Sequence, residues 1–347
     1  MRTTEARRVG AARVDAGSEQ SSGSLAPAAH QSTARPDDGP FLFLPLRTQP
    51  FLPMLRIALP NKGRLAEEAR ELFNDAGLEV RARGDRALTA SLGGEFQALF
   101  VRAQDIPEFV ADGAADAGIT GWDLVAESDR SLDVLLDLEF GRCRLAVAAT
   151  EESGIDSTGQ IPSGARVATS FPRLARRFFD ELHRPVELVP VTGAAEIAPH
   201  IGIADVIVDL VSTGSTLRVN GLQEIATVLE STARLVVSRG ALDDRAAGPA
   251  SSTKARALGE LSIALESVIR ARGKRYVMAN VPKSKLDDVR RVLPGLNGPT
   301  VIDILNGGTY VAVHAVTPAA TIYRTVSELK ALGAEGILVT RIERLMP

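Results

Sequence analysis

A strand that ends in an acid and runs into a small-residue turn is the most informative stretch of the sequence. Residues 204–217 read ADVIVDLVSTGSTL, with Asp209 before the turn and hydroxyl-bearing residues on both sides of Gly214. Free backbone N–H groups at a helix start can hold a phosphate, and glycine lets the backbone approach a ligand closely. The Asp209 carboxylate could accept two hydrogen bonds from ribose hydroxyls. The segment therefore predicts a sugar-phosphate site, with an ordinary Ser/Thr-capped loop as the simpler alternative.

Basic side chains follow two other predicted strands. Lys62 lies in a Pro-Asn-Lys-Gly turn between a strand at 55–59 and a helix that begins near Leu65. Arg102 follows a strand at 98–101. A cation at a helix start suits an anion because the free N–H groups there carry partial positive charge. For Lys62 alone, a solvated surface lysine is the alternative.

Alternating strands and helices must position these side chains. The pattern favours a largely parallel α/β sheet, whose ligands lie beyond the carboxyl ends of the strands. The turns at 60–64, 102–105, 118–123 and 209–216 are therefore the places to look for chemistry. Further strands are expected at 117–121, 145–149, 166–169 and 186–191, and helices after Asp105, after 121, and at 172–182, 194–203 and 255–272.

Composition excludes several classes of protein. The chain has 347 residues, 45% hydrophobic and 24% charged, which is typical of a globular protein of two or three domains. Its net charge of −3 argues against a general nucleic-acid binder. No apolar run is long enough to span a membrane. A single cysteine cannot form an intrachain disulfide, which is typical of a reducing compartment, and we expect a cytoplasmic protein.

Residues 1–53 differ from the rest of the chain. They are rich in Ser, Ala, Gly, Pro and Arg and have neither strand nor helix periodicity, so we expect a disordered extension. The first 40 residues contain no continuous apolar core of a secretory signal. Met54, directly before the first predicted strand, is a possible natural start.

Several motifs in the same order resemble the ATP phosphoribosyltransferase family. They are residues 59–65 (LPNKGRL), 102–107 (RAQDIP), 116–121 (DAGITG), 196–199 (EIAP), 202–205 (GIAD), 209–217 (DLVSTGSTL) and 220–222 (NGL). The resemblance covers about 54–347. It implies two α/β lobes like those of periplasmic binding proteins, with a catalytic cleft between them. The first lobe would comprise 54–143 and 239–273, and the second 144–238 with the phosphate loop.

The C-terminal residues indicate which form of the family this chain resembles. Strands and helices expected over 274–347 follow the order βαββαβ, which is that of a ferredoxin-like domain. In the long form of the family such a domain binds histidine, the pathway end product, and mediates feedback inhibition. The resemblance assigns the histidine pocket to Asn280, Leu296, Thr300 and Gly336.

The resemblance implies the first step of histidine biosynthesis. N1 of ATP attacks the anomeric carbon of phosphoribosyl pyrophosphate, and pyrophosphate leaves through an oxocarbenium-like state. Mg²⁺ is the expected cofactor, held mainly through substrate phosphates. Asp209 would hold the ribose hydroxyls. The 5′-phosphate would bind Ser212, Thr213, Gly214, Ser215 and Thr216, and the other phosphates Lys62, Arg64 and Arg102. Asp123 and Glu196 would also contact substrate, although each could equally cap or brace a helix.

Partners follow from the same resemblance: ATP, phosphoribosyl pyrophosphate, histidine as inhibitor, and further copies of the chain in a hexamer with a dimer as the smaller form. Three rival interpretations remain. A salvage-type phosphoribosyltransferase usually has two adjacent acids before its loop, whereas Val208 precedes Asp209 here. A solute-binding protein would need no phosphate loop. A silent regulatory paralogue is disfavoured by Lys62, Arg64, Arg102 and the intact loop.

Overall fold

The computed structural model describes residues 54–346 except 83, 85–86, 242–248 and 306–307. The expectation that residues 1–53 are disordered therefore lies outside the described residues. Within the described part of the chain, no helix is long and apolar enough to cross a membrane.

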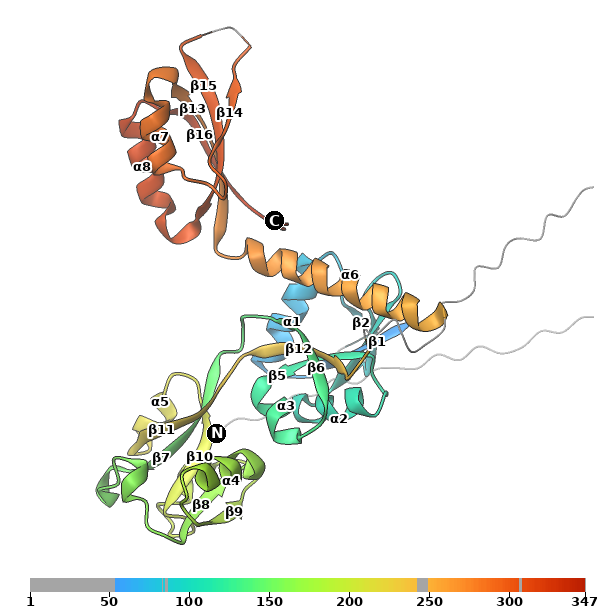
Figure 1. The fold of residues 1–347 in the computed structure, drawn as a ribbon, viewed down its shortest axis with the longest axis vertical. Helices are drawn as coiled ribbons and strands as arrows, with labels where there is room; N and C mark the ends of the chain where they lie inside the picture. The colour runs from blue at the N-terminus through green and yellow to red at the C-terminus, as the bar shows by residue number, and fades with distance from the viewer. Residues whose placement is uncertain (1–53, 83, 85–86, 242–248, 306–307, 347) are drawn as a thin grey trace, which may run out of the picture. The chain divides into compact units, whose positions relative to one another are not determined.

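Seven strands form the sheet of the first α/β unit (Figure 1). Their order is β2-β3-β4-β1-β5-β12-β6, with β1 parallel to β4 and β5 and the other described pairings antiparallel. The strands are β1 (Leu55–Pro60), β2 (Arg81–Ala82), β3 (Thr89–Ser91), β4 (Phe96–Val101), β5 (Ala117–Gly121), β6 (Leu132–Asp137) and β12 (Ala233–Ser238).

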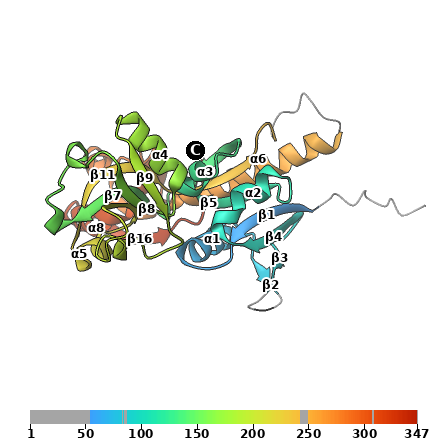
Figure 2. The same cartoon turned by 90° about the horizontal axis from the view of Figure 1, so that it is seen from below.

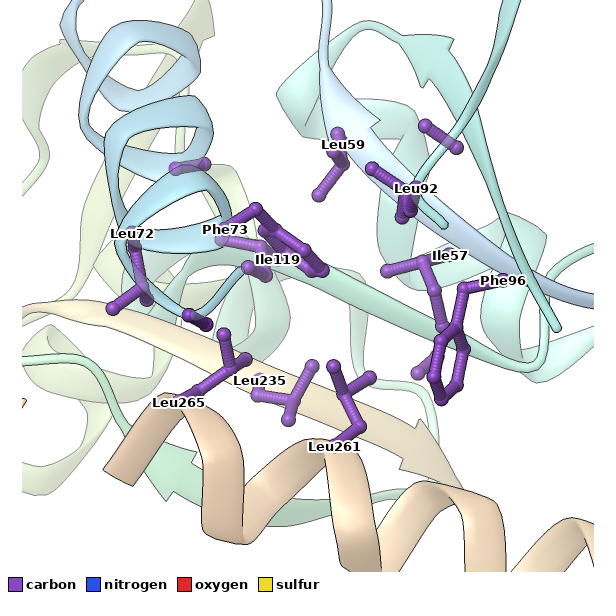
Figure 3. Close-up of a cluster of buried hydrophobic side chains, with 14 of the residues drawn as sticks. Ile57, Leu59, Leu72, Phe73, Leu92, Phe96, Ile119, Leu235, Leu261 and Leu265 are labelled. Atoms are coloured by element: carbon purple, nitrogen blue, oxygen red, sulfur yellow. The ribbon is translucent and has the colours of Figure 1, made fainter. Parts of the chain in front are cut away.

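Alternating side chains of these strands bury two faces. Helices α1 (Arg64–Asp75) and α6 (Pro249–Ala271) cover one face, where Phe73, Leu261 and Leu265 gather around Leu235 (Figure 3). Helices α2 (Ile106–Ala111) and α3 (Trp122–Ser128) cover the other. Gly118 permits this packing, because a Cβ there would overlap Ile106 and Val110.

Five strands form the second α/β unit, in the order β11-β7-β10-β8-β9. They are β7 (Cys143–Thr150), β8 (Ala165–Thr169), β9 (Val186–Pro190), β10 (Val206–Val211) and β11 (Leu222–Ser231). The strands β10, β8 and β9 are parallel, and β7 is antiparallel to both β10 and β11. Helix α4 (Pro172–Glu181) lies beside β8 and β9 (Figure 2). The short helix α5 (Ser215–Val219) packs Leu217 against the opposite face of the sheet.

The C-terminal residues form the expected ferredoxin-like domain. Its strands have the order β14-β15-β13-β16, and neighbouring strands are antiparallel. Its helices α7 and α8 lie on the same side of the sheet (Figure 1). The elements are β13 (Lys274–Pro282), α7 (Leu286–Val292), β14 (Thr300–Asp303), β15 (Tyr310–Pro318), α8 (Ile322–Ala331) and β16 (Glu335–Arg341).

Several local expectations need correction. The two larger sheets are mixed rather than largely parallel, because antiparallel strands lie on both sides of the parallel trio β4-β1-β5 and on one side of the trio β10-β8-β9. The expected second lobe, 144–238, is too long, since β12 returns to the first sheet after β11 ends at Ser231. Only the 3₁₀ turn Ala195–Ile197 replaces the helix expected at 194–203. Helix α6 begins at Pro249, before the expected 255.

Six short 3₁₀ turns complete the described secondary structure. They are Ala103–Asp105, Glu151–Ser153, Thr158–Gln160, Ala195–Ile197, Lys283–Lys285 and Ala319–Thr321.

Candidate active site

The alternation of β10 determines where Asp209 lies. Val206 and Val208 pack into the core on the α4 side of the sheet, and Ile207 and Val211 pack on the opposite side. Since side chains two residues apart share a face, Asp209 lies on the side of Ile207 and Val211, with α5 and the Ala195–Ile197 turn. The sequence of a single strand thus places an acid beside the following loop.

Asp209 lines a small cavity of about 140 Å³ at this end of the strand. Its Oδ1 accepts the backbone N–H of Leu210 at 2.8 Å. Burial raises the pKa of the Asp209 carboxyl above its ordinary value, and the charge of nearby Glu196 raises it further. The cavity is lined by Glu196, Asp209, Leu210, Val211, Ser212, Thr213, Gly214, Thr216 and Leu217. Two acids and three hydroxyl side chains therefore meet in one place.

The loop after β10 has its own hydrogen bonding. The hydroxyls of Thr213 and Ser215 lie 2.9 Å apart, and the Ser215 N–H donates to Oγ1 of Thr213 at 3.5 Å. Gly214, directly before α5, has φ = 74°, a left-handed conformation that favours glycine. Ser215 belongs to the loop but does not line the described cavity. The turn leaves Ser212, Thr213 and Thr216 at the cavity.

Arg144 is a cation near this loop that sequence reasoning missed. On β7 it lies opposite Val211 of β10, and its Nη1 donates to the Ser212 carbonyl at 3.4 Å. Two further bonds, of 2.7 and 2.5 Å, join its guanidinium to Glu224 of β11 and lower the pKa of that carboxyl. Nothing local marks Arg144, because only the antiparallel register of β7 with β10 brings it to the loop.

Arg102 lies in a different cavity, of about 660 Å³. That cavity includes Gln104, Ser170, Arg173 and Thr192, but neither Asp209 nor the 212–216 loop. Lys62 and Arg64 line neither cavity; Arg64 forms a loose 3.7 Å pair with Glu68. Among the described residues, the structure therefore brings Asp209, Glu196 and the loop together, and it does not bring the three predicted cations into that cavity.

Asp123 is placed where it braces the fold. Its side chain is 3% exposed, and the Ser231 hydroxyl donates to Oδ1 at 2.5 Å, while the Asp123 N–H donates back to Ser231 at 3.0 Å. Burial raises the pKa of the Asp123 carboxyl. The pair joins the start of α3 to the end of β11. The structure therefore shows Asp123 as a brace at the start of α3, and its contact with substrate stays a prediction.

Three of the four residues assigned to a histidine pocket lie on one sheet. A Cβ added to Gly336, which has φ = 56°, would lie 3.4 Å from Nδ2 of Asn280. Thr300 pairs with His314 on β15, whose Nδ1 lies 2.8 Å from the Tyr276 hydroxyl. Leu296, in the loop after α7, is 56% exposed. The structure thus brings Asn280 and Gly336 together and places Leu296 in a separate loop.

No group of three or more His, Cys, Asp or Glu side chains that could hold a metal occurs among residues 54–346 as far as they are described. The acidic arrangement at the candidate site is the pair of carboxylates Asp209 and Glu196. Two protein carboxylates match the few protein ligands that Mg²⁺ takes when substrate phosphates supply the rest.

The strand-end acid and the hydroxyl-rich loop of a mixed α/β sheet suit a sugar-phosphate ligand, as an enzyme of the pentosyltransferase class requires. Two family models match the chain: that of ATP phosphoribosyltransferase over residues 102–258, and that of the HisG C-terminal domain over 271–344. The chain belongs to the ATP phosphoribosyltransferase family, whose enzymes catalyse the first step of histidine biosynthesis.

Individual relatives agree with this assignment. The chain is 67% identical over 299 residues to the ATP phosphoribosyltransferase of Gemmatimonas aurantiaca, covering 85% of this chain and all of the relative. It is 43% identical over 295 residues to that of Methanocaldococcus jannaschii, covering 84% of this chain and all of that protein. A solved ATP phosphoribosyl transferase (HisG:HisZ) complex from Thermotoga maritima is similar over 62% of this chain and 99% of that chain, with 26% identity and a TM-score of 0.53.

Proposed function

We propose that the chain transfers the phosphoribosyl group of phosphoribosyl pyrophosphate to N1 of ATP in a Mg²⁺-dependent reaction that histidine inhibits. The observation that carries the proposal is the cavity shared by Asp209, Glu196 and the 212–216 loop. It combines carboxylate acceptors for ribose hydroxyls with backbone and hydroxyl donors for a phosphate.

In this proposal the loop binds the 5′-phosphate and Asp209 binds the ribose. Ser212, Thr213 and Thr216 offer hydroxyls at the cavity, and the Gly214 conformation turns the chain into α5. Arg144 contributes positive charge next to the loop, and its two bonds with Glu224 fix the position of its guanidinium. Ser215 acts through its contact with Thr213.

The remaining phosphates are assigned to three cationic side chains. We propose that Arg102, Lys62 and Arg64 face pyrophosphate or triphosphate oxygens. All three are exposed and follow β4 and β1, which are adjacent parallel strands. Arginine can bind two phosphate oxygens at once, which aligns as well as neutralises.

Displacement at the anomeric carbon needs alignment and charge stabilisation rather than a protein nucleophile. The nucleophile is N1 of the adenine, the bond from the anomeric carbon to pyrophosphate breaks, and positive charge develops on the ribose. The Asp209 carboxylate, whose Oδ1 accepts the Leu210 N–H, would accept hydrogen bonds from the hydroxyls of that ribose. Mg²⁺ would be held mainly by the substrate phosphates, with Glu196 as the carboxylate of the cavity that is not assigned to the ribose, and it would neutralise phosphate charge.

We further propose that the ferredoxin-like domain binds histidine through Asn280, Thr300 and Gly336, with Leu296 contributing from its loop. Asn280 provides a donor and an acceptor, and Gly336 leaves space beside it. The domain division is then 54–137 with 233–271 for the first catalytic unit, 143–231 for the second, and 274–346 for the regulatory domain. We also propose that six copies of the chain form a hexamer and that the protein is located in the cytoplasm.

The test is turnover. Purified chain with Mg²⁺, ATP and phosphoribosyl pyrophosphate is expected to form phosphoribosyl-ATP, followed by ultraviolet absorbance and identified by mass. Removal of Mg²⁺ with a chelator should abolish the product, and readdition should restore it. Folded protein that forms no phosphoribosyl-ATP would contradict the proposal.

A further inference from the structure

Helix α3 is shared by the two α/β units. It follows β5 of the first sheet and packs Trp122 and Val125 into the first unit. Leu124 and Ala126 of the same helix pack against the core of the second unit. At its start, Asp123 bonds Ser231 at the end of β11. A change in the relation of the two units must therefore disturb α3.

The end of α3 caps the start of α4, which belongs to the second unit. Oε1 of Glu127 accepts the Arg173 backbone N–H at 2.9 Å, and Oε2 accepts that of Leu174 at 3.0 Å. Pro172, the first residue of α4, has no N–H, and the Ala175 N–H bonds the Phe171 carbonyl within the helix. One carboxylate from the first unit thus satisfies both free donors in the first turn of α4.

The capping is reciprocal. The Arg173 guanidinium donates from Nη1 to the carbonyls of Glu127 at 3.1 Å and Ser128 at 2.7 Å, at the C-terminal end of α3. A looser ion pair of 3.9 Å joins Arg177 of α4 to Asp129. Each helix end therefore has unpaired backbone groups satisfied by the other helix, and the negative and positive groups match the two helix dipoles.

We propose that Glu127 is a positioning residue that holds the two α/β units in the relation needed for substrate binding. Glu127 and Arg173 both line the 660 Å³ cavity that contains Arg102. Rotating the units apart would break all four bonds at this clasp, defined as Glu127, Ser128, Arg173 and Leu174, and would leave the first-turn N–H groups of α4 without a side-chain acceptor. The proposal rests on the proposed function for its kinetic effect but not for its structural effect.

The expected kinetic effect is a rise in KM with little change in kcat. When only a fraction of the molecules holds the arrangement that binds substrate, the apparent affinity is the intrinsic affinity multiplied by that fraction. Saturating substrate draws all molecules into the binding arrangement, so kcat changes little. Loss of a helix N-cap corresponds to a change of about 2- to 30-fold in an equilibrium constant. For Glu127→Ala we therefore expect the KM of ATP or phosphoribosyl pyrophosphate to rise within about that range. Glu127→Gln keeps one oxygen acceptor and should lie between Glu127→Ala and the wild type.

Two structural measurements on the full chain need no turnover. Hydrogen exchange at the Arg173 and Leu174 amides should accelerate in both Glu127 variants. Spin labels at Glu71→Cys in α1 and Glu152→Cys in the second unit, with Cys143 replaced by serine, should give a broader distance distribution in Glu127→Ala. The labels are diluted with unlabelled chain so that only intramolecular distances are read.

Glu181→Gln is the matched control, because Glu181 is an exposed acid at the other end of α4. It should leave exchange, label distances and KM unchanged. If Glu127→Ala does not fold, Glu127→Gln decides the matter. Wild-type amide exchange and wild-type label distances in a folded Glu127 variant would overturn the proposal. If the wild type is inactive but the Glu127 variants show faster amide exchange and broader label distances, the proposed function is rejected and the structural role of Glu127 is supported.

Discussion

Replacing Asp209 by asparagine removes one charge and leaves the shape of the candidate ribose site nearly intact. In the described structure, Oδ1 of Asp209 is occupied by the Leu210 N–H, and Oδ2 has no protein partner. In the Asp209→Asn variant, the amide oxygen can keep the Leu210 bond, so the amide NH₂ group then faces the cavity. A donor replaces the charged acceptor that the ribose hydroxyls need.

The expected cost follows from that exchange. A hydrogen bond to a charged group contributes about 1.5–3 kcal/mol. If Asp209 makes such a hydrogen bond to the ribose in the transition state, kcat/KM of the Asp209→Asn variant for phosphoribosyl pyrophosphate should fall about 10- to 150-fold. The fold should not suffer. Because burial raises the pKa of Asp209 from 3.8, its contribution to stability is complete below pH 3.8 and is lost as the pH rises through the folded pKa. At neutral pH the asparagine variant should be at least as stable.

The assay is initial-rate kinetics of phosphoribosyl-ATP formation with phosphoribosyl pyrophosphate varied at saturating ATP. Thermal unfolding of the same samples checks the fold. Asp180→Asn, a change of the same kind at an exposed position on α4, should leave kcat/KM unchanged. An Asp209→Asn enzyme with wild-type kcat/KM would refute the assignment of the ribose to Asp209.

Four further predictions follow from the described contacts. Glu196→Gln removes a charge that raises the pKa of Asp209, so the acidic limb of the kcat/KM–pH profile should move to lower pH. An acidic limb at the wild-type pH would show that the charge of Glu196 does not act on Asp209. Gly214→Ala should cost about 1–2 kcal/mol of backbone strain and raise the KM of phosphoribosyl pyrophosphate, whereas Gly118→Ala, where a Cβ would overlap Ile106, should lower the unfolding temperature. Asn280→Ala should abolish histidine inhibition in titrations while uninhibited turnover stays at the wild-type rate; retained inhibition would remove Asn280 from the pocket.

Local patterns predicted the parts of the fold that depend on near neighbours. The strand at 55–59, the helix after it and the loop after β10 were all predicted, because apolar alternation, Gly and Pro signals and the run of small residues are written in consecutive positions. The ferredoxin-like order was predicted for the same reason. At the candidate site, the sequence singled out Asp209, Glu196 and the loop, and the structure brings them together in one cavity.

Distant pairings could not be predicted. Strand β12 begins two residues after β11 ends, yet it joins β5 and β6, a choice that depends on the first sheet and on no signal in 233–238. Arg144 reaches the loop only through antiparallel register. The burial of Asp123 depends on Ser231, 108 residues away. The residue types of β12, Arg144 and Asp123 are compatible with several roles. Only the tertiary structure determines which role each one has.

A crystal structure of the chain with phosphoribosyl pyrophosphate and Mg²⁺ tests the central claim most directly. The account predicts that the ribose hydroxyls lie within hydrogen-bonding distance of Asp209 and that the 5′-phosphate lies on the backbone N–H groups and hydroxyls of residues 212–216. A ligand whose 5′-phosphate is bound instead in the cavity of Arg102, with the 212–216 loop free of phosphate, would contradict it.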